Sequence, residues 1–423
     1  MAHFGILCPP SQGHINPSII LGKELRRRGH TITFLNIIDC KDKIESAGFN
    51  FETIGLGTFP KGSMDLLYAK LGQSSEHQMV LYWNEFCLKL AEITTQEIIE
   101  TIQGMDVDIL IVDQIDIIGG SIAEFLEIPF ITICYGLLTF CEKSVPSPFT
   151  NLPYDNSEVG IKVNEWMLPY VQKSFEPMRT FINIHRSNWG LPPFEATHNP
   201  FYSSSLAQIS QFPKALDFPR EKLDKCFHYT GPFIDHAPED DIDFPYHLLD
   251  GRPIIYTSLG TLVNQKKEMF SKIAEACKNF NYQLIMVTTT QPVDDFLDLP
   301  GNPLVLRYVP QNKILKLAKL IITHGGVNTL LDAIMNSVPI ITIPITFDQP
   351  GCAERVRWHK IGEVIPLKQV SPEKISEAIL KIIRNPEYLQ NVKAMKASIS
   401  QIDGTIEACN IIENVAESVL ETI

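Results

Sequence analysis

The fold is read most directly from two neighbouring segments, Thr323-His324-Gly325-Gly326-Val327-Asn328-Thr329 and Pro344-Ile345-Thr346-Phe347-Asp348-Gln349-Pro350. The first follows an apolar run typical of a strand and opens into a helical pattern. Its glycines therefore fall where backbone N–H groups converge at a helix N-terminus, which is a common phosphate site. His324 and Thr329 add hydrogen-bond donors, and Asp332, one helical turn further on, can accept bonds from ribose hydroxyls. The spacing predicts a site for a nucleoside diphosphate.

Taken together and in this order, the elements resemble the nucleotide-sugar signature of the family-one UDP-glycosyltransferases in its shorter bacterial form, T-H-G-G-x-N-T, D-A, V-P and D-Q-P. A lone Gly-Gly between a strand and a helix is often only a tight turn, so the ordered combination carries the resemblance. It implies that Asp348 and Gln349 bind sugar hydroxyls. It also implies donor-binding roles for residues of the glycine loop and the helix after it, namely His324, Gly326, Val327, Asn328, Thr329 and Asp332.

Length and composition indicate an enzyme of two domains. The 423 residues exceed what one core usually supports, so two domains of about 200 residues are expected. The net charge of −13 argues against a nucleic-acid partner. No apolar run is long enough to span a membrane, and the N-terminus lacks a signal-peptide layout, so the sequence predicts a cytoplasmic protein. The nine cysteines lack C-x-x-C spacing and predict neither a zinc site nor a disulfide framework.

Short apolar runs alternate with helical patterns, which is typical of parallel sheets covered by helices. The expected helices include 17–28, with Pro17 at its start, and a long one at 76–103. The expected strands are 3–8, 31–36, 51–54, 109–112, 130–134, 206–210 and 227–230 in the first half, and 254–258, 283–288, 304–308, 320–323, 340–343 and 363–365 in the second.

The predicted fold class is therefore α/β, with two Rossmann-like domains in tandem, 1–231 and 251–404. A segment rich in proline and acidic residues, 232–250, forms the linker. Ligands are expected in a cleft between the domains, outside the carboxyl ends of the strands. The resemblance implies the GT-B fold, with the first domain binding the acceptor and the second binding the nucleotide sugar. It also implies that the C-terminal helix, 405–423, crosses back to the first domain.

The loop after the first expected strand holds the candidate catalytic base, His14. An unperturbed imidazole pKa near 6.5 suits a histidine to remove a hydroxyl proton near neutral pH. A lone histidine here could equally cap the helix or pack on the neighbouring prolines. However, Gly13-His14-Ile15-Asn16-Pro17 resembles the acceptor-activating G-H-x-N-P motif of the same family, which implies catalysis by His14 and places Gly13 beside the donor.

A histidine base benefits from a carboxylate that fixes its tautomer. Asp113 stands at the C-terminal end of the strand 109–112, so it should reach the same edge of the sheet, and it resembles the partner aspartate of the family. Asp116 is an alternative, because either carboxylate of Val-Asp-Gln-Ile-Asp could reach His14. Asp113 could also simply cap the following turn.

Two shorter motifs complete the expected donor site. Ser258-Leu259-Gly260-Thr261 resembles the S-x-G-T loop of the family, which implies phosphate contacts from Ser258, Gly260 and Thr261. Tyr308-Val309-Pro310-Gln311 resembles W-x-P-Q, in which the aromatic ring stacks on uracil and the glutamine contacts base or ribose. Tyrosine in place of tryptophan reduces the stacking area. Asp332 likewise replaces the glutamate of plant members.

No Asp-x-Asp motif or other metal-ligand spacing is found, so the sequence predicts no metal and no cofactor. The diphosphate charge would be met by the helix terminus, His324 and backbone donors. The resemblance implies a single displacement that inverts the anomeric carbon and releases UDP, with UDP-glucose as the expected donor.

The expected acceptor is an apolar small molecule with an accessible hydroxyl, such as a carotenoid or polyketide. Segments 57–83 and 135–200 are rich in aromatic residues, proline and methionine, as expected around an apolar pocket, although most of these residues should be ordinary core. The opening residues resemble the bacterial carotenoid glucosyltransferases, with the macrolide enzymes as close relatives. For a lipid acceptor, transient contact with a membrane surface is expected.

Three alternatives differ in what they require. A UDP-sugar 2-epimerase shares the architecture, but G-H-x-N-P and the Asp348-Gln349 pair fit transfer to an acceptor better. A nicotinamide-dependent oxidoreductase needs G-x-G-x-x-G after the first strand, which this chain lacks. A non-catalytic UDP-sugar-binding protein would retain the second domain but lose His14 and its carboxylate. The sequence leaves the oligomeric state open.

Overall fold

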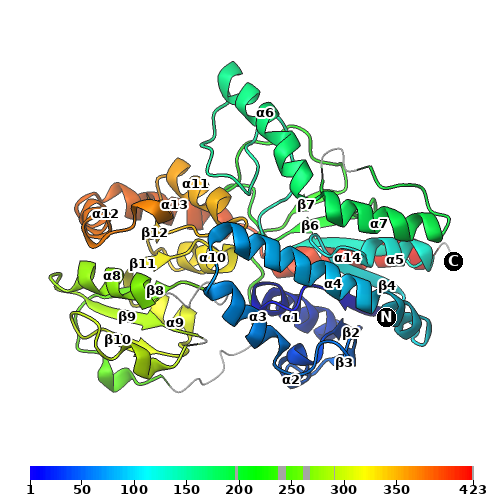
Figure 1. The fold of residues 1–423 in the computed structure, drawn as a ribbon, viewed down its shortest axis with the longest axis horizontal. Helices are drawn as coiled ribbons and strands as arrows, with labels where there is room; N and C mark the ends of the chain where they lie inside the picture. The colour runs from blue at the N-terminus through cyan, green and yellow to red at the C-terminus, as the bar shows by residue number, and fades with distance from the viewer. Residues whose placement is uncertain (196–198, 237–243, 261–266, 290, 422–423) are drawn as a thin grey trace.

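The structure is a computed structural model that describes residues 1–195, 199–236, 244–260, 267–289 and 291–421. The described residues form two lobes, each built on a parallel sheet (Figure 1). The first sheet has the order β3-β2-β1-β4-β5-β6-β7 and the second β10-β9-β8-β11-β12-β13. The strands are β1 His3–Leu7, β2 Thr31–Asn36, β3 Asn50–Thr53, β4 Ile109–Asp113, β5 Phe130–Cys134, β6 Gln208–Ser210, β7 Phe227–Tyr229, β8 Ile254–Ser258, β9 Gln283–Val287, β10 Leu304–Leu306, β11 Ala318–Thr323, β12 Ile340–Thr342 and β13 Gly362–Val364.

Both sheets have the doubly wound order in which the chain starts at the centre, builds one side and then switches to the other. The switch lies between β1 and β4 in the first sheet and between β8 and β11 in the second. Ligands of such sheets bind at this switch point, outside the carboxyl ends of the strands. The α/β fold class predicted from the sequence is confirmed, and each expected strand is present with small changes at its ends.

Helices cover both sheets (Figure 1). They are α1 Gln12–Arg27, α2 Lys41–Ser46, α3 Ser63–Gly72, α4 Glu76–Gln103, α5 Gly119–Phe125, α6 Glu158–Ser174, α7 Glu176–Asn188, α8 Lys267–Cys277, α9 Gln311–Leu315, α10 Val327–Met335, α11 Gln349–Trp358, α12 Pro372–Arg384, α13 Glu387–Ile399 and α14 Gly404–Leu420. Local chemistry explains several boundaries. Ser75 and Gln78 form a capping box that starts α4, and the Asp403 side chain caps α14.

The predicted start of the first helix is wrong. The sequence places Pro17 at its first position, but α1 begins at Gln12, where the Ser11 carbonyl accepts hydrogen bonds from His14 and Ile15. Pro17 therefore lies inside the helix, where its missing N–H leaves the carbonyl four residues earlier, that of Gly13, without its usual donor. This position also moves His14 from a loop into the first helical turn.

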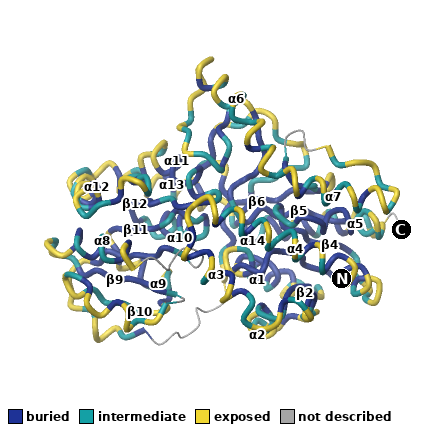
Figure 2. The backbone as a smooth tube through the Cα atoms, in the orientation of Figure 1, coloured by how far each residue is buried: buried dark blue, intermediate teal, exposed yellow. Residues whose placement is uncertain are grey.

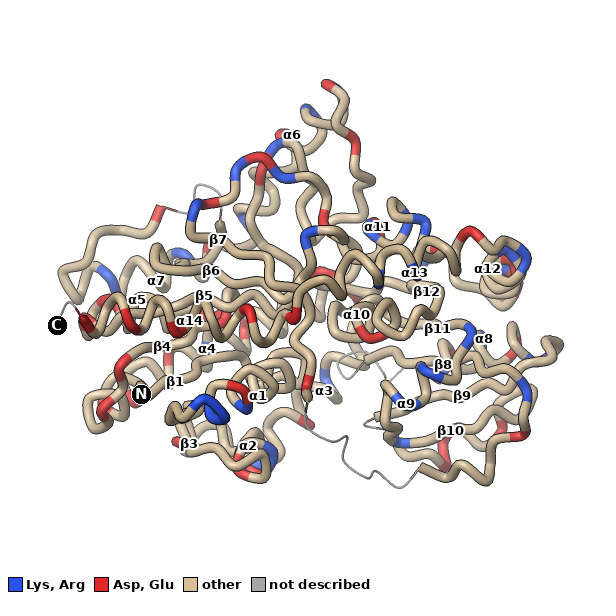
Figure 3. The backbone as a smooth tube through the Cα atoms, turned by 180° about the vertical axis from the view of Figure 1, so that it is seen from behind, with Lys and Arg blue, Asp and Glu red and all other residues tan. Residues whose placement is uncertain are grey.

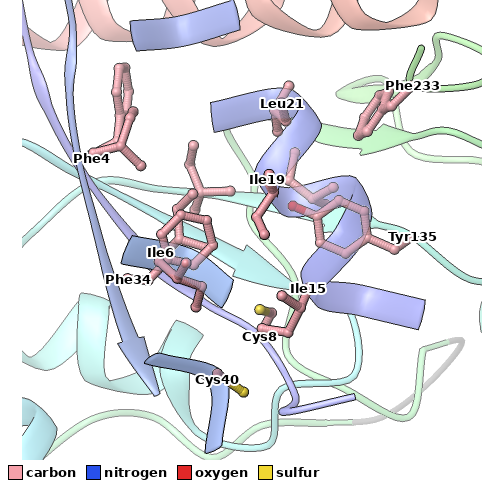
Figure 4. Close-up of a cluster of buried hydrophobic side chains, with 14 of the residues drawn as sticks. Phe4, Ile6, Cys8, Ile15, Ile19, Leu21, Phe34, Cys40, Tyr135 and Phe233 are labelled. Atoms are coloured by element: carbon pink, nitrogen blue, oxygen red, sulfur yellow. The ribbon is translucent and has the colours of Figure 1, made fainter. Parts of the chain in front are cut away.

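The strands form the buried centre of each lobe (Figure 2). β4, β5, β8 and β9 are buried at every position, as expected for strands covered on both faces. Figure 4 shows how Phe4, Ile6 and Phe34 of the first sheet pack against Ile15, Ile19 and Leu21 of α1. This packing fixes the start of α1 over the end of β1.

The last helix of the chain packs against the first lobe. α14 contacts α1 and lies beside the first sheet in Figure 1. Glu413 of α14 accepts bonds from Arg28 at 2.5 Å and His30 at 2.9 Å, and Thr405 bonds to the backbone of Ile234. Acidic and basic residues are interspersed along helices such as α6 and α12 (Figure 3). Within the described ranges, no helix is long and apolar enough to cross a membrane.

Candidate active site

His14 lies at the switch point of the first sheet, in the first turn of α1, and Asp113 ends β4 beside it. Their atoms Nδ1 and Oδ2 are 2.5 Å apart. The Asp113 side chain is fully buried and its Oδ1 accepts a bond from the Ile115 backbone at 3.0 Å, so the carboxylate is held in place. The His14 side chain is 17% exposed. A proton on Nδ1 shared with Asp113 leaves Nε2 as the basic atom.

Asp116, the alternative partner, has another task. Its Oδ1 accepts bonds from the backbone N–H groups of Ile118 at 3.0 Å and Gly119 at 2.6 Å, and so caps the start of α5. Burial raises its pKa to about 6. Of the two carboxylates that the sequence left open, Asp113 is the one bonded to His14.

The surroundings of His14 make it a stronger base than free imidazole. Burial alone would lower its pKa, but the charge of Asp113 and the hydrogen bond to it act in the opposite direction, with a smaller contribution from Asp348. The net result is a raised pKa. Because Asp348 belongs to the second domain, both domains act on this imidazole.

The glycine loop occupies the switch point of the second sheet. It follows β11 and leads into α10, with Gly326 as the N-cap and Gly325 at φ +90°, a left-handed conformation that favours glycine. The N–H groups of Val327, Asn328 and Thr329 in the first turn of α10 have no partner within the helix and are available to an anion. Val327 turns its side chain into the core, so any contact of this residue with a donor uses the backbone.

His324 is held between two glycines. A Cβ added at Gly260 or at Gly326 would lie 2.6 Å from ring atoms of His324. Burial lowers the pKa of His324 to about 4, although a backbone hydrogen bond with Ser258 acts in the other direction. At neutral pH this imidazole is therefore an uncharged donor. Thr261, also expected near the phosphates, lies outside the described residues.

The expected nucleoside contacts gather around Gln311. Its Nε2 donates to Asp332 Oδ2 at 2.6 Å, and its Oε1 accepts from the Tyr256 hydroxyl at 3.2 Å. Burial raises the pKa of Asp332 to about 6. Tyr308 is 63% exposed and presents its ring at the surface, whereas the Val309 side chain packs in the core. Tyr256 was missed by sequence reasoning, since a strand tyrosine looks like ordinary core.

Asp348 and Gln349 start α11. Asp348 Oδ2 accepts a bond from the backbone of Leu137, in the first domain, at 3.0 Å. Gln349 is buried, and its Oε1 accepts from Ile345 at 2.9 Å and Thr346 at 3.0 Å, which stabilises the turn before the helix. Only the amide nitrogen of Gln349 is thus left to meet a sugar hydroxyl.

The Asn328 side chain makes two contacts that the sequence did not predict. Its Nδ2 donates to the Gly13 carbonyl at 2.9 Å, and its Oδ1 accepts from Gln211 Nε2 at 2.9 Å. The Gly13 carbonyl is the group that Pro17 leaves without a helical donor. The Asn328 side chain thus joins the two domains, while its backbone N–H in the first turn of α10 stays available to an anion. Gln211 follows an expected strand, and its place at the same sheet edge was the signal that could have found it.

The switch points of the two sheets therefore face each other, with His14 and Asp113 on one side and the glycine loop on the other. Residues 58–407 match the profile of the family described as "UDP-glucoronosyl and UDP-glucosyl transferase". The chain belongs to this family. The resemblance seen in the sequence is thereby confirmed, and the protein is a glycosyltransferase, an enzyme that transfers sugar.

Individual relatives of this glycosyltransferase align over nearly the whole chain. The "Zeaxanthin glucosyltransferase" of Pantoea ananas is 31% identical over 98% of this chain and 96% of its own, and that of Pseudescherichia vulneris is 28% identical over 98% of each. The crystal structure of CalG4, the calicheamicin glycosyltransferase, is 20% identical, covers 99% of both chains and superposes with a TM-score of 0.74. This likeness shows the GT-B fold.

Proposed function

We propose that this glycosyltransferase transfers glucose from UDP-glucose to a hydroxyl of an apolar small molecule, with inversion at the anomeric carbon. The observation that supports it best is the contact between Asn328 and Gly13. This bond holds the N-terminus of α10 against the residue that precedes His14, so an anion on α10 and an acceptor at His14 would be neighbours.

The reaction would proceed in one displacement. His14 Nε2 removes the acceptor's hydroxyl proton while the oxygen attacks the anomeric carbon, and the bond from that carbon to the diphosphate breaks on the opposite face. The leaving UDP carries the negative charge, which the N-terminus of α10 and the neutral His324 would stabilise. The proton on His14 passes to solvent after the product leaves.

Aromatic residues beside Asp348 support an apolar acceptor. Phe347, which precedes Asp348, contacts Trp83 of α4 across the junction, with ring centroids 6.0 Å apart. Trp83 also contacts Phe86, which in turn packs on Phe59. These rings make the junction beside Asp348 apolar, which favours an apolar acceptor. The Pantoea ananas relative, named for zeaxanthin, makes carotenoid alcohols the first compounds to try.

The proposal is tested by incubating the protein with UDP-glucose and a panel of apolar alcohols that includes carotenoid diols and macrolide aglycones. We expect a hexose adduct in the mass spectrum of at least one alcohol, formed only when UDP-glucose is present. A panel without any adduct, while UDP-glucose is consumed to another UDP-sugar, would favour the epimerase instead.

The pH dependence should reflect the raised pKa of His14. A protonated His14 cannot accept the acceptor's proton, so kcat/KM should fall as the pH drops through that pKa, with a midpoint above the ordinary 6.5. Asp113→Asn removes the charge that raises the pKa, so its midpoint should move to lower pH and its maximal rate should also fall. An unchanged midpoint in this variant would show that another group controls the profile.

Transfer should not depend on a divalent metal. In the parts of the chain that the structure describes, no group of His, Cys, Asp and Glu side chains is arranged to hold one. Charge on the diphosphate would be met by backbone N–H groups and His324. We expect the same initial rate with and without EDTA, and a rate that collapses with EDTA and returns with Mg²⁺ or Mn²⁺ would contradict this.

A further inference from the structure

One face of α11, in the second domain, contacts the first domain. Residues 348, 351, 355 and 359 recur at the spacing that places side chains on the same face of a helix. Asp348 bonds to Leu137, Gly351 N donates to the Pro148 carbonyl at 3.1 Å, and His359 bonds to the Leu216 carbonyl at 3.1 Å. Arg355 completes the stripe. The helix that carries the expected sugar-binding residues is thus seated on the acceptor domain along its whole length.

The seat is close. A Cβ added at Gly351 would lie 2.6 Å from the Pro148 carbonyl oxygen, nearer than any real Cβ contact. The backbone of α11 therefore touches the first domain directly at this point. A small shift of α11 along or around its axis would break this contact.

At the centre of the stripe lies a buried ion pair between the domains. Arg355 and Asp217 are each 1% exposed, and Arg355 Nε and Nη2 approach Asp217 Oδ1 at 2.8 and 2.5 Å. Arg220 Nε and the Tyr229 hydroxyl donate to Asp217 Oδ2 at 2.8 and 2.7 Å. Burial alone would raise the pKa of Asp217, but the charges of Arg355 and Arg220 hold it well below its usual range.

The geometry around Arg355 leaves it little freedom. Its guanidinium carbon lies 4.1 Å from the ring centroid of Phe218, and its Nη1 donates to the Gly351 carbonyl at 3.0 Å. A buried ion pair is weak as a source of stability, because both charges lose their water. In this pair, the bonds of Arg355 to Asp217 and to the Gly351 carbonyl are all formed in one arrangement, which defines the position of the side chain.

We propose that Arg355 and Asp217 are positioning residues for the transfer reaction, which fix α11 so that the Asp348 carboxylate faces His14 from the second domain. This inference rests on the proposed function. Arg355 stands two turns after Asp348 on the same helix face, so it sets both the rotation and the axial position of the helix. Neither residue is expected to touch the substrate.

The pKa of His14 offers a second measure of the position of α11, because Asp348 acts on His14. The charged groups that act on His14 are Asp113 from β4 and Asp348 from α11. The Tyr135 ring packs edge-on against His14, with the two ring centroids 6.3 Å apart. If α11 shifts, Asp113 stays in place and only the contribution of Asp348 changes. The His14 pKa should then fall towards its value in Asp348→Asn.

The test compares Arg355→Met and Arg355→Lys with a matched control, Arg357→Met. Arg357 lies on the same helix but is half exposed, and among the residues that the structure describes it pairs only with Glu354 of that helix. We expect kcat for transfer to fall about 10- to 100-fold in Arg355→Met, the scale for misplacing groups by an ångström. The Kd for UDP should stay within about 2-fold, because the expected uridine and phosphate contacts lie on other elements. Arg357→Met should match the wild type.

Arg355→Lys keeps the charge but loses the paired donors, so its kcat should lie between those of the wild type and Arg355→Met. If Arg355→Met does not fold, as judged by circular dichroism, the test uses Arg355→Lys. This variant should show the same combination of a lower kcat and an unchanged Kd for UDP. Unchanged kcat in a folded variant, or a parallel loss of UDP affinity, would overturn the assignment.

Failure of the proposed function would look different, since the wild type itself would transfer no sugar. In that case the pKa of His14 still tests the positioning role. It is measured by an NMR titration of protein with ring-labelled histidine, in which the His14 signal is identified by its absence in His14→Ala. A lower His14 pKa in the folded Arg355 variant supports the positioning role, and an unchanged pKa overturns it.

Discussion

His14→Ala should lose nearly all transfer to alcohols, with kcat falling about 10²- to 10⁴-fold, the usual contribution of a general base. The imidazole is the basic group that both Asp113 and Asp348 act on, so the substitution removes the group expected to take the acceptor's proton. The Kd for UDP, measured by calorimetry, should stay within about 2-fold because, apart from Gly13, the expected donor contacts lie in the second domain.

The matched control for this variant is His247→Ala, which removes an exposed imidazole within the segment 232–250 expected to be the linker. It should retain wild-type transfer. If His14→Ala were as active as His247→Ala, His14 would be a structural residue at the start of α1, and the base would have to be sought elsewhere.

Separate substitutions of Asp348 and Asp332 should affect binding differently, because Asp348 is expected to contact the sugar and Asp332 the nucleotide. Asp348 starts α11 at the junction with the first domain, whereas Asp332 lies beside Gln311 in the second domain. Asp348→Ala should weaken UDP-glucose by about 1.5–3 kcal/mol, the value of a hydrogen bond to a charged partner, and leave UDP unchanged. Asp332→Ala should weaken UDP and UDP-glucose equally.

Calorimetric titration of both ligands against both variants measures this difference. Asp348→Asn, which keeps the shape of the side chain, controls for the lost bond to Leu137. Should Asp348→Ala weaken bare UDP as much as Asp332→Ala does, the sugar would not lie where we place it.

The sequence was sufficient for features that depend on local chemistry. Apolar runs with the length of strands identified the strands of both sheets, because buried parallel strands are apolar throughout. Parallel strands bring their carboxyl ends to one edge, so the sequence pattern alone places His14, Asp113 and His324 near the strand ends. The alternation of strands and helices is what predicts that these strands are parallel.

Contacts between the domains could not be predicted in the same way. The Asn328 side chain bonds to Gly13 and Gln211, which lie far away in the sequence, and the donor-binding motif around Asn328 gave no sign of this contact. The buried pair of Arg355 and Asp217 has no sequence signal, because a helix arginine is usually exposed. The oxygen of Gln349 is likewise used by its own turn. These roles depend on how two domains meet, and local patterns do not encode that.

We propose that His14 and the glycine loop together form an inverting site for sugar transfer. NMR can follow the reaction of UDP-[1-¹³C]glucose, an α-linked donor, with an accepted alcohol. We predict that the label appears in a β-linked glucoside as UDP is released, and that His14→Ala forms none. An α-linked product, or label that moves only into an epimerised UDP-sugar, would show that this site does not transfer sugar with inversion.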